Sequence, residues 1–283
     1  MAADAARREL ERMIDLLGDI PPMPSVATRI LRVASSEFAQ VSEVTRLIGM
    51  DTGLASKVLS TCNSAYYGLP HRVKTLSRAV ALLGFKAVRN LVLVHSLPWK
   101  RAASPTFAEQ VIWTHSAAAA MAGRMLATEH GEMDPEEALL SGLLHDAGRL
   151  AMNLMMPDDY EQVMRAIYNR EGESLALEQA RFGADHTIAG QIVLEKWSFP
   201  EELVAVARDH HLPPAEMPGH VLVARASDEL VRLKGFGAAK LEQPPETMPP
   251  ALAAMGYELG ELEGLAERLD QAIQQGQDVF QLA

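Results

Sequence analysis

Residues 141–150 read SGLLHDAGRL, and this stretch poses the central question of the fold. Two leucines precede the adjacent ionisable residues His145 and Asp146, and Ala-Gly-Arg follows them. Because desolvating a charge costs more free energy than apolar packing returns, such a pair is rarely buried without a partner. The pair is therefore expected to hold a metal ion or a phosphate group, or to be a remnant of such a site kept in place by hydrogen bonds.

The sequence on either side of this stretch repeats its apolar residues every three to four positions, which predicts helices. Residues 108–131 and 134–156 are each expected to form one helical element, and the small residues of the first imply close packing against a neighbour. In the first half we expect one helix over residues 4–17 and another from Ser25 to about residue 36. Two short helices are expected within 41–68, meeting near 51–53, and two more within 73–97, joined at Gly84. In the second half we expect single helices over 157–172, 174–183, 185–199, 200–211, 220–235 and 257–275.

The predicted fold is all-α: a multi-helix bundle with an N-terminal helical subdomain. Three parts are expected along the chain: an N-terminal helical half over residues 1–100, a second helical half over 101–240 that contains the candidate site, and a proline-rich break with a final helix over 241–283.

Composition and charge exclude several classes of function. The formal net charge of −11 disfavours broad contact with nucleic acid, which needs a basic face, although a local basic patch is still compatible with it. The single cysteine, Cys62, cannot form an intramolecular disulfide and suits a reducing compartment. No segment approaches the roughly 20 apolar residues that span a bilayer, and the N-terminus has no apolar secretory core. These features predict a soluble cytoplasmic protein without a membrane partner.

The second half of the chain contains a set of residues with the character of metal ligands. Each lies on a predicted helix or at a helix end, so that a packed bundle can direct them to one point. Imidazole and carboxylate groups together suit Mn, Fe, Zn or Mg rather than thiophilic metals. The candidate ligands are His115, His145, Asp146, His186, His210, His211 and Asp228. Adjacent ligands point about 100° apart on a helix, so the pairs suit a helix end or a wall shared by two metals.

Each of these residues also has a purely structural explanation. His115 could be a core histidine bonded to a carbonyl group, and His186 could cap a helix. The pair His210 and His211 ends a helix, where cations are favoured in any case. Asp228 is different, because it lies on an apolar helical stripe where an unpaired carboxylate would be costly.

Several motifs resemble the HDOD family, whose members are relatives of the HD-domain metal-dependent phosphohydrolases in bacterial signalling proteins. In the first half these are IPPMPSVATRIL, MDTGLASKVLSTCNSAYYG and TLSRAVALLGFKAVRNLVL. In the second half they are WTHS around His115, GLLHDAGRL, FGADHTIAGQIVLEKWSFP and ARDHH. The resemblance covers nearly all of residues 18–230, and it implies an HD-like helical bundle and a role in signalling.

Compared with the related HD-GYP phosphodiesterases of cyclic di-GMP, the seven candidate ligands match the order of a dinuclear metal site. The chain departs from that pattern at three places. LPPAEMPGH replaces the Gly-Tyr-Pro element, which makes cyclic di-GMP a doubtful substrate. Arg149 stands where a lysine is usual, and its guanidinium can still grip a phosphate group. Val111 stands where some relatives carry an acidic residue, which disfavours a third metal.

Two functions are consistent with these residues. The first is a signalling output module that acts through a protein partner or a nucleotide. The second is a dinuclear phosphohydrolase for a nucleotide or another phosphoester. In the second, Asp146 would bridge two divalent ions, with His115, His145 and Asp228 around one and His186, His210 and His211 around the other. Asp146 and Arg149 would then be the catalytic residues, with Arg149 orienting the phosphate.

Overall fold

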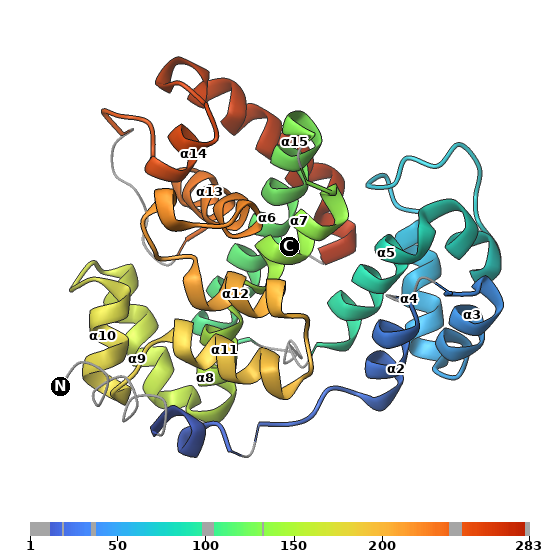
Figure 1. Ribbon diagram of the computed structural model, residues 1–283, viewed down its shortest axis with the longest axis horizontal. Coiled ribbons are helices and arrows are strands. Elements are labelled where there is room, and N and C mark those ends of the chain that lie inside the picture. The colour runs from blue at the N-terminus through green and yellow to red at the C-terminus, as the bar shows by residue number, and fades with distance from the viewer. Residues whose placement is uncertain are drawn as a thin grey trace. The chain divides into compact units, whose positions relative to one another are not determined.

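In the computed structural model the chain forms two compact units, each assembled from two stretches of sequence. The first unit comprises residues 1–21 and 101–270, and the second comprises residues 22–100 and 271–283. The structure describes residues 12–18, 20–34, 38–97, 105–131, 133–237 and 245–280. Within these ranges every regular element is a helix, which confirms the all-α prediction (Figure 1). Most of the helix predicted over residues 4–17 lies outside the described residues.

The second unit contains the helices α2 (Ser25–Ala34), α3 (Val41–Gly49), α4 (Thr52–Cys62) and α5 (Leu76–Ser96). Asp51 separates α3 from α4 and caps α4, because its side chain accepts a hydrogen bond from the amide of Leu54 at 3.0 Å. Gly84 interrupts α5 with φ 82°, a conformation that glycine adopts readily. Both junctions agree with the sequence-based prediction.

One helix, α5, is long and apolar enough to cross a membrane by length and composition alone. Half of its most apolar window is buried inside the protein, and Gly84 breaks its regular geometry. Its buried residues include Val88, Leu91 and Leu93, so α5 has the character of a core helix.

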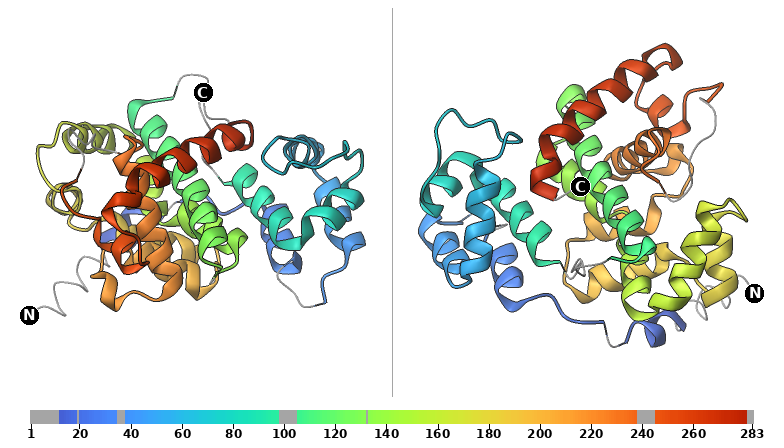
Figure 2. Two further views of the ribbon diagram at one scale, coloured as in Figure 1. Left: turned by 90° about the horizontal axis from the view of Figure 1, so that it is seen from above. Right: turned by 180° about the vertical axis from the view of Figure 1, so that it is seen from behind.

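The first unit contains α6 (Phe107–His130), α7 (Pro135–Leu144), α8 (Ala147–Met155), α9 (Pro157–Tyr168), α10 (Ser174–Phe182), α11 (His186–Lys196), α12 (Glu201–Asp209), α13 (Gly219–Leu233) and α14 (Pro250–Ala254), with 3₁₀ turns η1 (Pro214–Glu216) and η2 (Leu259–Glu261). Helix α15 (Leu262–Phe280) belongs to the first unit up to Asp270 and to the second from Gln271. Helix α6 packs on α7 and α13, and α8 packs on α11 (Figure 2).

Two glycines set how closely these helices approach. A Cβ atom on Gly142 of α7 would lie 2.2 Å from the carbonyl oxygen of Ala119 in α6. A Cβ atom on Gly148 of α8 would lie 1.9 Å from the carbonyl oxygen of His186 in α11. The two glycines flank the His145-Asp146 pair, and they bring the backbones of α6 and α11 up to it. The close packing expected of α6 is confirmed.

The element predicted over residues 134–156 is two helices rather than one. Helix α7 ends at Leu144 and α8 begins at Ala147, with His145 and Asp146 between them. A continuous helix would direct these adjacent side chains about 100° apart. The break leaves both side chains pointing into the same buried region, with 0% and 6% exposed.

Candidate metal centre

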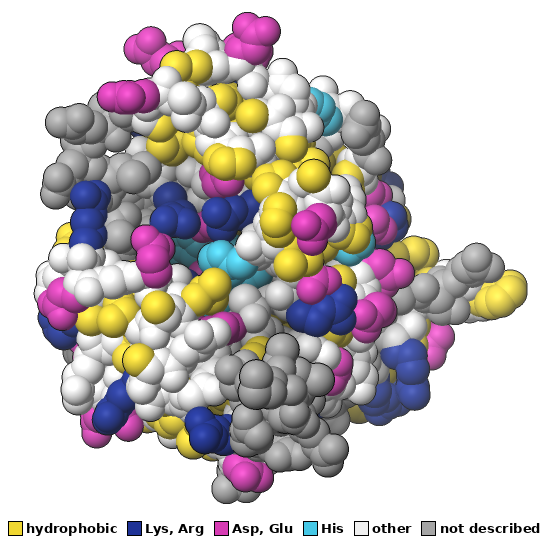
Figure 3. Space-filling model, turned by 60° about the vertical axis from the view of Figure 1, so that its left-hand side comes forward, with side chains coloured by type: hydrophobic (Ala, Val, Ile, Leu, Met, Phe, Trp, Pro, Cys, Tyr) yellow, Lys and Arg dark blue, Asp and Glu magenta, His cyan; other side chains and the backbone are white. Residues whose placement is uncertain are grey.

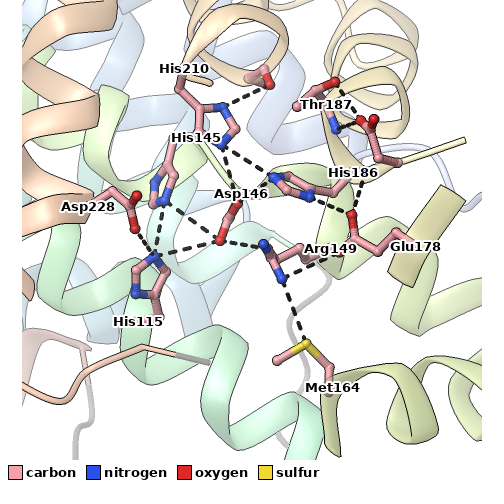
Figure 4. A network of polar contacts seen from close by, with 12 residues as sticks. His115, His145, Asp146, Arg149, Met164, Glu178, His186, Thr187, His210 and Asp228 are labelled. Carbon is pink, nitrogen blue, oxygen red and sulfur yellow. Dashed lines mark hydrogen bonds and ion pairs between the residues drawn. The ribbon is translucent and has the colours of Figure 1, made fainter. Parts of the chain in front are cut away.

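The first of two ligand groups consists of His115 from α6, His145 and Asp228 from α13. The Nε2 atoms of His115 and His145 are 3.1 Å apart, and His115 Nε2 lies 3.3 Å from Asp228 Oδ1 (Figure 4). All three side chains are buried, and their potential ligand atoms lie within 4.8 Å of one another. This spacing is compatible with a single ion between them.

The second group consists of three histidines from two elements. His186 is the first residue of α11, and His210 and His211 directly follow α12. His186 Nε2 lies 3.3 Å from His210 Nε2 and 3.1 Å from His211 Nε2. Their potential ligand atoms again lie within 4.8 Å of one another.

Asp146 lies between the two groups and directs one oxygen atom to each (Figure 4). Its Oδ1 is 3.3 Å from His186 Nε2 and 3.6 Å from His210 Nε2. Its Oδ2 is 3.6 Å from His115 Nε2 and 3.7 Å from His145 Nε2. The structure thus brings together all seven residues that the sequence suggested, in the two sets expected, with Asp146 shared.

Hydrogen bonds at the far side of three rings determine which nitrogen faces the centre. The Nδ1 atom of His115 contacts the carbonyl oxygen of Phe236 at 2.5 Å, and that of His145 contacts the carbonyl oxygen of Gly142 at 2.8 Å. His210 Nδ1 lies 3.1 Å from the carbonyl oxygens of Val206 and Ala207. A carbonyl oxygen only accepts, so each Nδ1 carries the proton and each Nε2 has its lone pair free for a metal.

Lone pairs that face each other at 3.1 Å repel unless a proton or a cation lies between them. Burial alone would lower the pKa of His115, but the hydrogen bond and charge of Asp228 raise it above its usual value. Burial lowers the pKa of His145 to about 4. The surroundings of His115 thus favour a positive charge beside its Nε2 atom, which a bound metal ion would supply. The hydrogen bond from His115 Nδ1 to the carbonyl oxygen of Phe236 is the structural role that the sequence analysis also considered for this residue. The other ring nitrogen, Nε2, faces His145 and the rest of the centre.

The remaining contacts of His186 involve Glu178, which the sequence analysis did not identify. Glu178 is fully buried in α10, and its Oε2 accepts hydrogen bonds from His186 Nδ1 at 2.6 Å and from the His186 amide at 2.9 Å. Its Oε1 accepts from the hydroxyl of Tyr160 at 2.8 Å. Burial alone would raise the pKa of Glu178, but the charges of His186 and Arg149 lower it to about 2. Carboxylates in this position fix the tautomer and orientation of a ligating histidine.

A sequence signal for Glu178 did exist. Glu178 lies three residues after Leu175 and four before Phe182, so it falls on the apolar face of the helix expected over residues 174–183. A charged residue on the inward face of an amphipathic helix requires a buried partner.

His211 fits a metal less well than the other six residues. Its Nδ1 lies 3.4 Å from Nη1 of Arg225, which can only donate, so the proton of the neutral ring belongs on Nε2. Burial and the neighbouring His210, His186 and Arg225 lower the pKa of His211. For His211 to act as a ligand through Nε2, Arg225 would have to turn away.

Arg149, expected to orient a phosphate, is buried and paired. Its Nε lies 2.9 Å from Asp146 Oδ2, and its Nη1 lies 3.4 Å from Glu178 Oε1. The guanidinium compensates two buried carboxylates, and it also lines the pocket described next. A phosphate contact through Arg149 therefore stays a prediction.

A pocket of about 760 Å³ in the first unit gives access to the centre. Histidine side chains are visible in a hollow with cationic side chains beside it (Figure 3). Three further arginines line the pocket, namely Arg170, Arg225 and Arg232. Arg225 and Arg232 approach Asp228 Oδ2 to 3.1 and 3.6 Å. Although burial alone would raise the pKa of Asp228, His115 and Arg232 hold it well below its usual range.

Comparison with known proteins places the chain in a family. The model of the HDOD domain matches residues 20–213. The chain belongs to the HDOD family. An uncharacterised protein from Treponema pallidum is 25% identical over 202 residues, which is 71% of this chain and 39% of that protein. The chain thus spans well under half the length of this relative.

Solved structures show the same fold. An HDOD domain protein of unknown function from Geobacter sulfurreducens has a TM-score of 0.77 at 20% identity, covering 98% of this chain and 97% of that one. A protein from Marinobacter aquaeolei, described as a candidate signal transduction protein, has a TM-score of 0.72 at 22% identity, covering 99% and 64%. A candidate phosphohydrolase from Shewanella amazonensis has a TM-score of 0.73 at 22% identity, covering 95% and 97%. The HDOD helical fold expected from the motifs is confirmed.

Proposed function

We propose that this HDOD chain is a signalling output module whose helical centre binds two divalent cations and, through them, a phosphate-bearing nucleotide. The observation that carries the proposal is the position of Asp146, with one oxygen atom toward each histidine group. A carboxylate shared in this way is suited to bridging two ions in a dinuclear site.

The donor set favours particular metals. Five imidazoles and two carboxylates suit Mn, Fe or Zn better than Mg, which prefers oxygen ligands and keeps several waters. A cation pair would supply positive charge for a phosphate group and make a nearby water more acidic. The protein's own contribution is to hold the imidazole rings by their Nδ1 atoms and to keep Asp146 ionised.

Arginines of the pocket support a phosphate-bearing ligand. Arg225 has two carboxylate partners, Asp228 at 3.1 Å and Glu229 at 3.3 Å, whereas Arg232 reaches Asp228 only at 3.6 Å and is 44% exposed at its side chain. Of the two arginines beside Asp228, Arg232 is therefore the better placed to turn toward an entering phosphate. An anionic ligand would gain more from these cations than a neutral one, because charge-assisted hydrogen bonds are the stronger ones.

Metal analysis tests the proposal directly. Protein purified without chelator and reconstituted with Mn, Fe or Zn should contain close to two ions per chain, and the double variant His145→Ala, Asp146→Ala should contain few or none. His130→Ala is a matched control, because His130 is an exposed histidine that contacts Tyr257 rather than the centre. A wild type that takes up no ion, or a control that loses ions equally, would refute the metal centre.

A second candidate function is hydrolysis of a phosphoester, favoured by the open pocket that reaches Asp146 and both histidine groups. In that case a generic phosphodiester should be cleaved with added Mn or Fe, and cyclic di-GMP should be cleaved poorly because the Gly-Tyr-Pro element is absent. Turnover that survives His145→Ala, Asp146→Ala would assign the activity to a contaminant. Tight nucleotide binding without turnover would favour the module.

A further inference from the structure

The second unit has a local charge opposite to that of the whole chain. Residues 52–97 contain no Asp or Glu, although the chain has a net charge of −11. The same stretch contains six cationic residues: Lys57, Arg72, Lys74, Arg78, Lys86 and Arg89. Such a concentration of one sign attracts an anion to this part of the surface.

Part of this stretch forms a pocket of about 870 Å³, well separated in sequence from the candidate metal centre. One wall comes from α4 and the other from the segment after it. The lining residues are Ser56, Leu59, Ser60, Asn63, Leu69, His71, Arg72, Val73 and Lys74. Two cations and two hydroxyl groups thus share one pocket. Within the described part of the chain, neither Arg72 nor Lys74 forms an ion pair with an acidic side chain.

Asn63 fixes the segment that carries these cations. Its Oδ1 accepts a hydrogen bond from the amide of Val73 at 2.6 Å, and its Nδ2 donates to the carbonyl oxygen of Val73 at 2.9 Å. Val73 is buried and packs with Cys62 and Ala79. Because the backbone of Val73 is anchored on both sides, the backbone that carries the exposed Arg72 and Lys74 is held beside the pocket before any ligand arrives. Preorganisation of this kind reduces the entropy lost on binding.

The lining also restricts the chemistry of the ligand. Arg72, Lys74 and the hydroxyl of Ser56 can donate from both walls, which suits the several oxygen atoms of a phosphate group. The apolar residues Leu59 and Leu69 can cover the rest of a small molecule. The lining contains no Phe, Tyr or Trp, and the imidazole of His71 is the one ring among these residues on which a base could stack. Because a single-stranded nucleic acid is held by several successive stacks, it fits poorly here.

We propose that this pocket is a binding site for a small phosphorylated molecule, with Arg72 and Lys74 holding the phosphate and Ser56 donating a hydrogen bond to it. The site is independent of the metal centre and needs no metal ion. A chain with this property would receive a chemical signal in its second unit, whatever its first unit binds.

Calorimetric titration with inorganic pyrophosphate tests the proposal, with chelator present so that any metal centre is empty. The wild type should bind, and Arg72→Ala, Lys74→Ala should weaken binding by about tenfold or more, since each substitution removes a charge-assisted hydrogen bond. Ser56→Ala should weaken it by about threefold to tenfold, as expected for one hydrogen bond. Thermal unfolding of each variant verifies that it is folded.

The matched control is Arg46→Ala, Arg78→Ala. It removes the same charge from exposed positions of the second unit that do not line the pocket. Unchanged pyrophosphate affinity in this control supports a specific site. No binding by the wild type, or equal weakening in both double variants, overturns the proposal.

Further ligands distinguish the source of the phosphate. Adenosine diphosphate and phosphoserine should each compete with pyrophosphate for the pocket. Tighter binding of adenosine diphosphate would indicate a free metabolite as the source, and tighter binding of phosphoserine would indicate a modified side chain. A short single-stranded oligonucleotide should compete poorly. If the oligonucleotide alone binds, the pocket is part of a general polyanion surface and the small-molecule proposal is wrong.

Discussion

Oε2 of Glu178 lies 2.6 Å from Nδ1 of His186, and neither side chain is exposed to solvent. This contact determines that the other nitrogen of His186 faces Asp146 and the neighbouring histidines. It also couples α10, which carries no candidate ligand, to the centre.

Replacement of Glu178 by glutamine should lower metal affinity by about 10- to 100-fold, the usual cost of losing a carboxylate that orients a ligating histidine. Glutamine can present its amide nitrogen to Nδ1 and so favour the wrong tautomer. Competition with a chromophoric chelator measures the affinity, and the ring tautomer of His186 can be followed by nitrogen NMR. Glu195→Gln is the control, because Glu195 is exposed and its side chain contacts Gln191 on the same helix. Equal losses in the two variants would contradict a positioning role.

The same carboxylate should make the metal-free protein sensitive to acid. The pKa of Glu178 falls from 4.5 to about 2 on folding, although burial opposes the change, because His186 and Arg149 favour the charged form. The stabilisation is therefore fully present above about pH 4.5 and is lost as the pH falls toward 2. In chelator, the wild type should be more stable than Glu178→Gln at neutral pH, and the difference in free energy of unfolding should shrink through this window. A difference that is constant with pH would exclude the ionised carboxylate as its cause.

Asp228→Asn should destabilise the protein even without metal. The sequence suggested a carboxylate that would be costly without a partner, but the structure gives Asp228 contacts with Arg225, Arg232 and His115. The substitution leaves those cations uncompensated, and we expect a loss of about 1–3 kcal/mol in chelator. Chemical denaturation measures it. With metal, the loss of an anionic ligand should add a reduction in affinity.

Asp270→Asn is the control for this prediction. Asp270 forms an ion pair with Lys234 at 2.7 Å but is exposed, so its loss should cost less than about 1 kcal/mol. An apo Asp228→Asn protein that is more stable than the wild type would show that Asp228 is not compensated in solution.

Gly148→Ala tests whether close helix packing positions the centre. Alanine normally favours a helix over glycine by about 1 kcal/mol, but its Cβ atom would lie 1.9 Å from the carbonyl oxygen of His186. Helices α8 and α11 would have to separate, at a net cost of about 1–3 kcal/mol or more, and metal uptake should fall with the displacement of His186. Gly219→Ala, on α13 with nothing within 4 Å of its Cβ position, should be neutral or slightly stabilising. Thermal unfolding and metal content of the two variants decide the matter.

The sequence was sufficient for the helical class and for the seven residues that the structure brings together, because both depend on local patterns. Apolar spacing gives the helices, and the residue types around His145 give the chemistry. Glu178 and Arg225 were missed because their roles depend on how neighbouring helices pack. Glu178 of α10 reaches His186 at the start of α11, and Arg225 of α13 reaches His211 just after α12. The division of residues 134–156 into two helices was missed for a related reason. Apolar spacing continues across the pair, and the break is favoured by the contacts that His145 and Asp146 make with other helices.

Asp146 has a thermodynamic consequence for the filling of the proposed centre. A carboxylate that donates one oxygen to each of two cations cannot serve either one independently, so occupancy of the two positions must be linked. The first cation would draw electron density from Asp146 and repel the second, which would favour stepwise filling at two different concentrations. The half-filled state is then a distinct state of the protein. If the second ion raises the affinity of the protein for a ligand by some factor, thermodynamic linkage requires that the ligand raise the affinity for the second ion by the same factor.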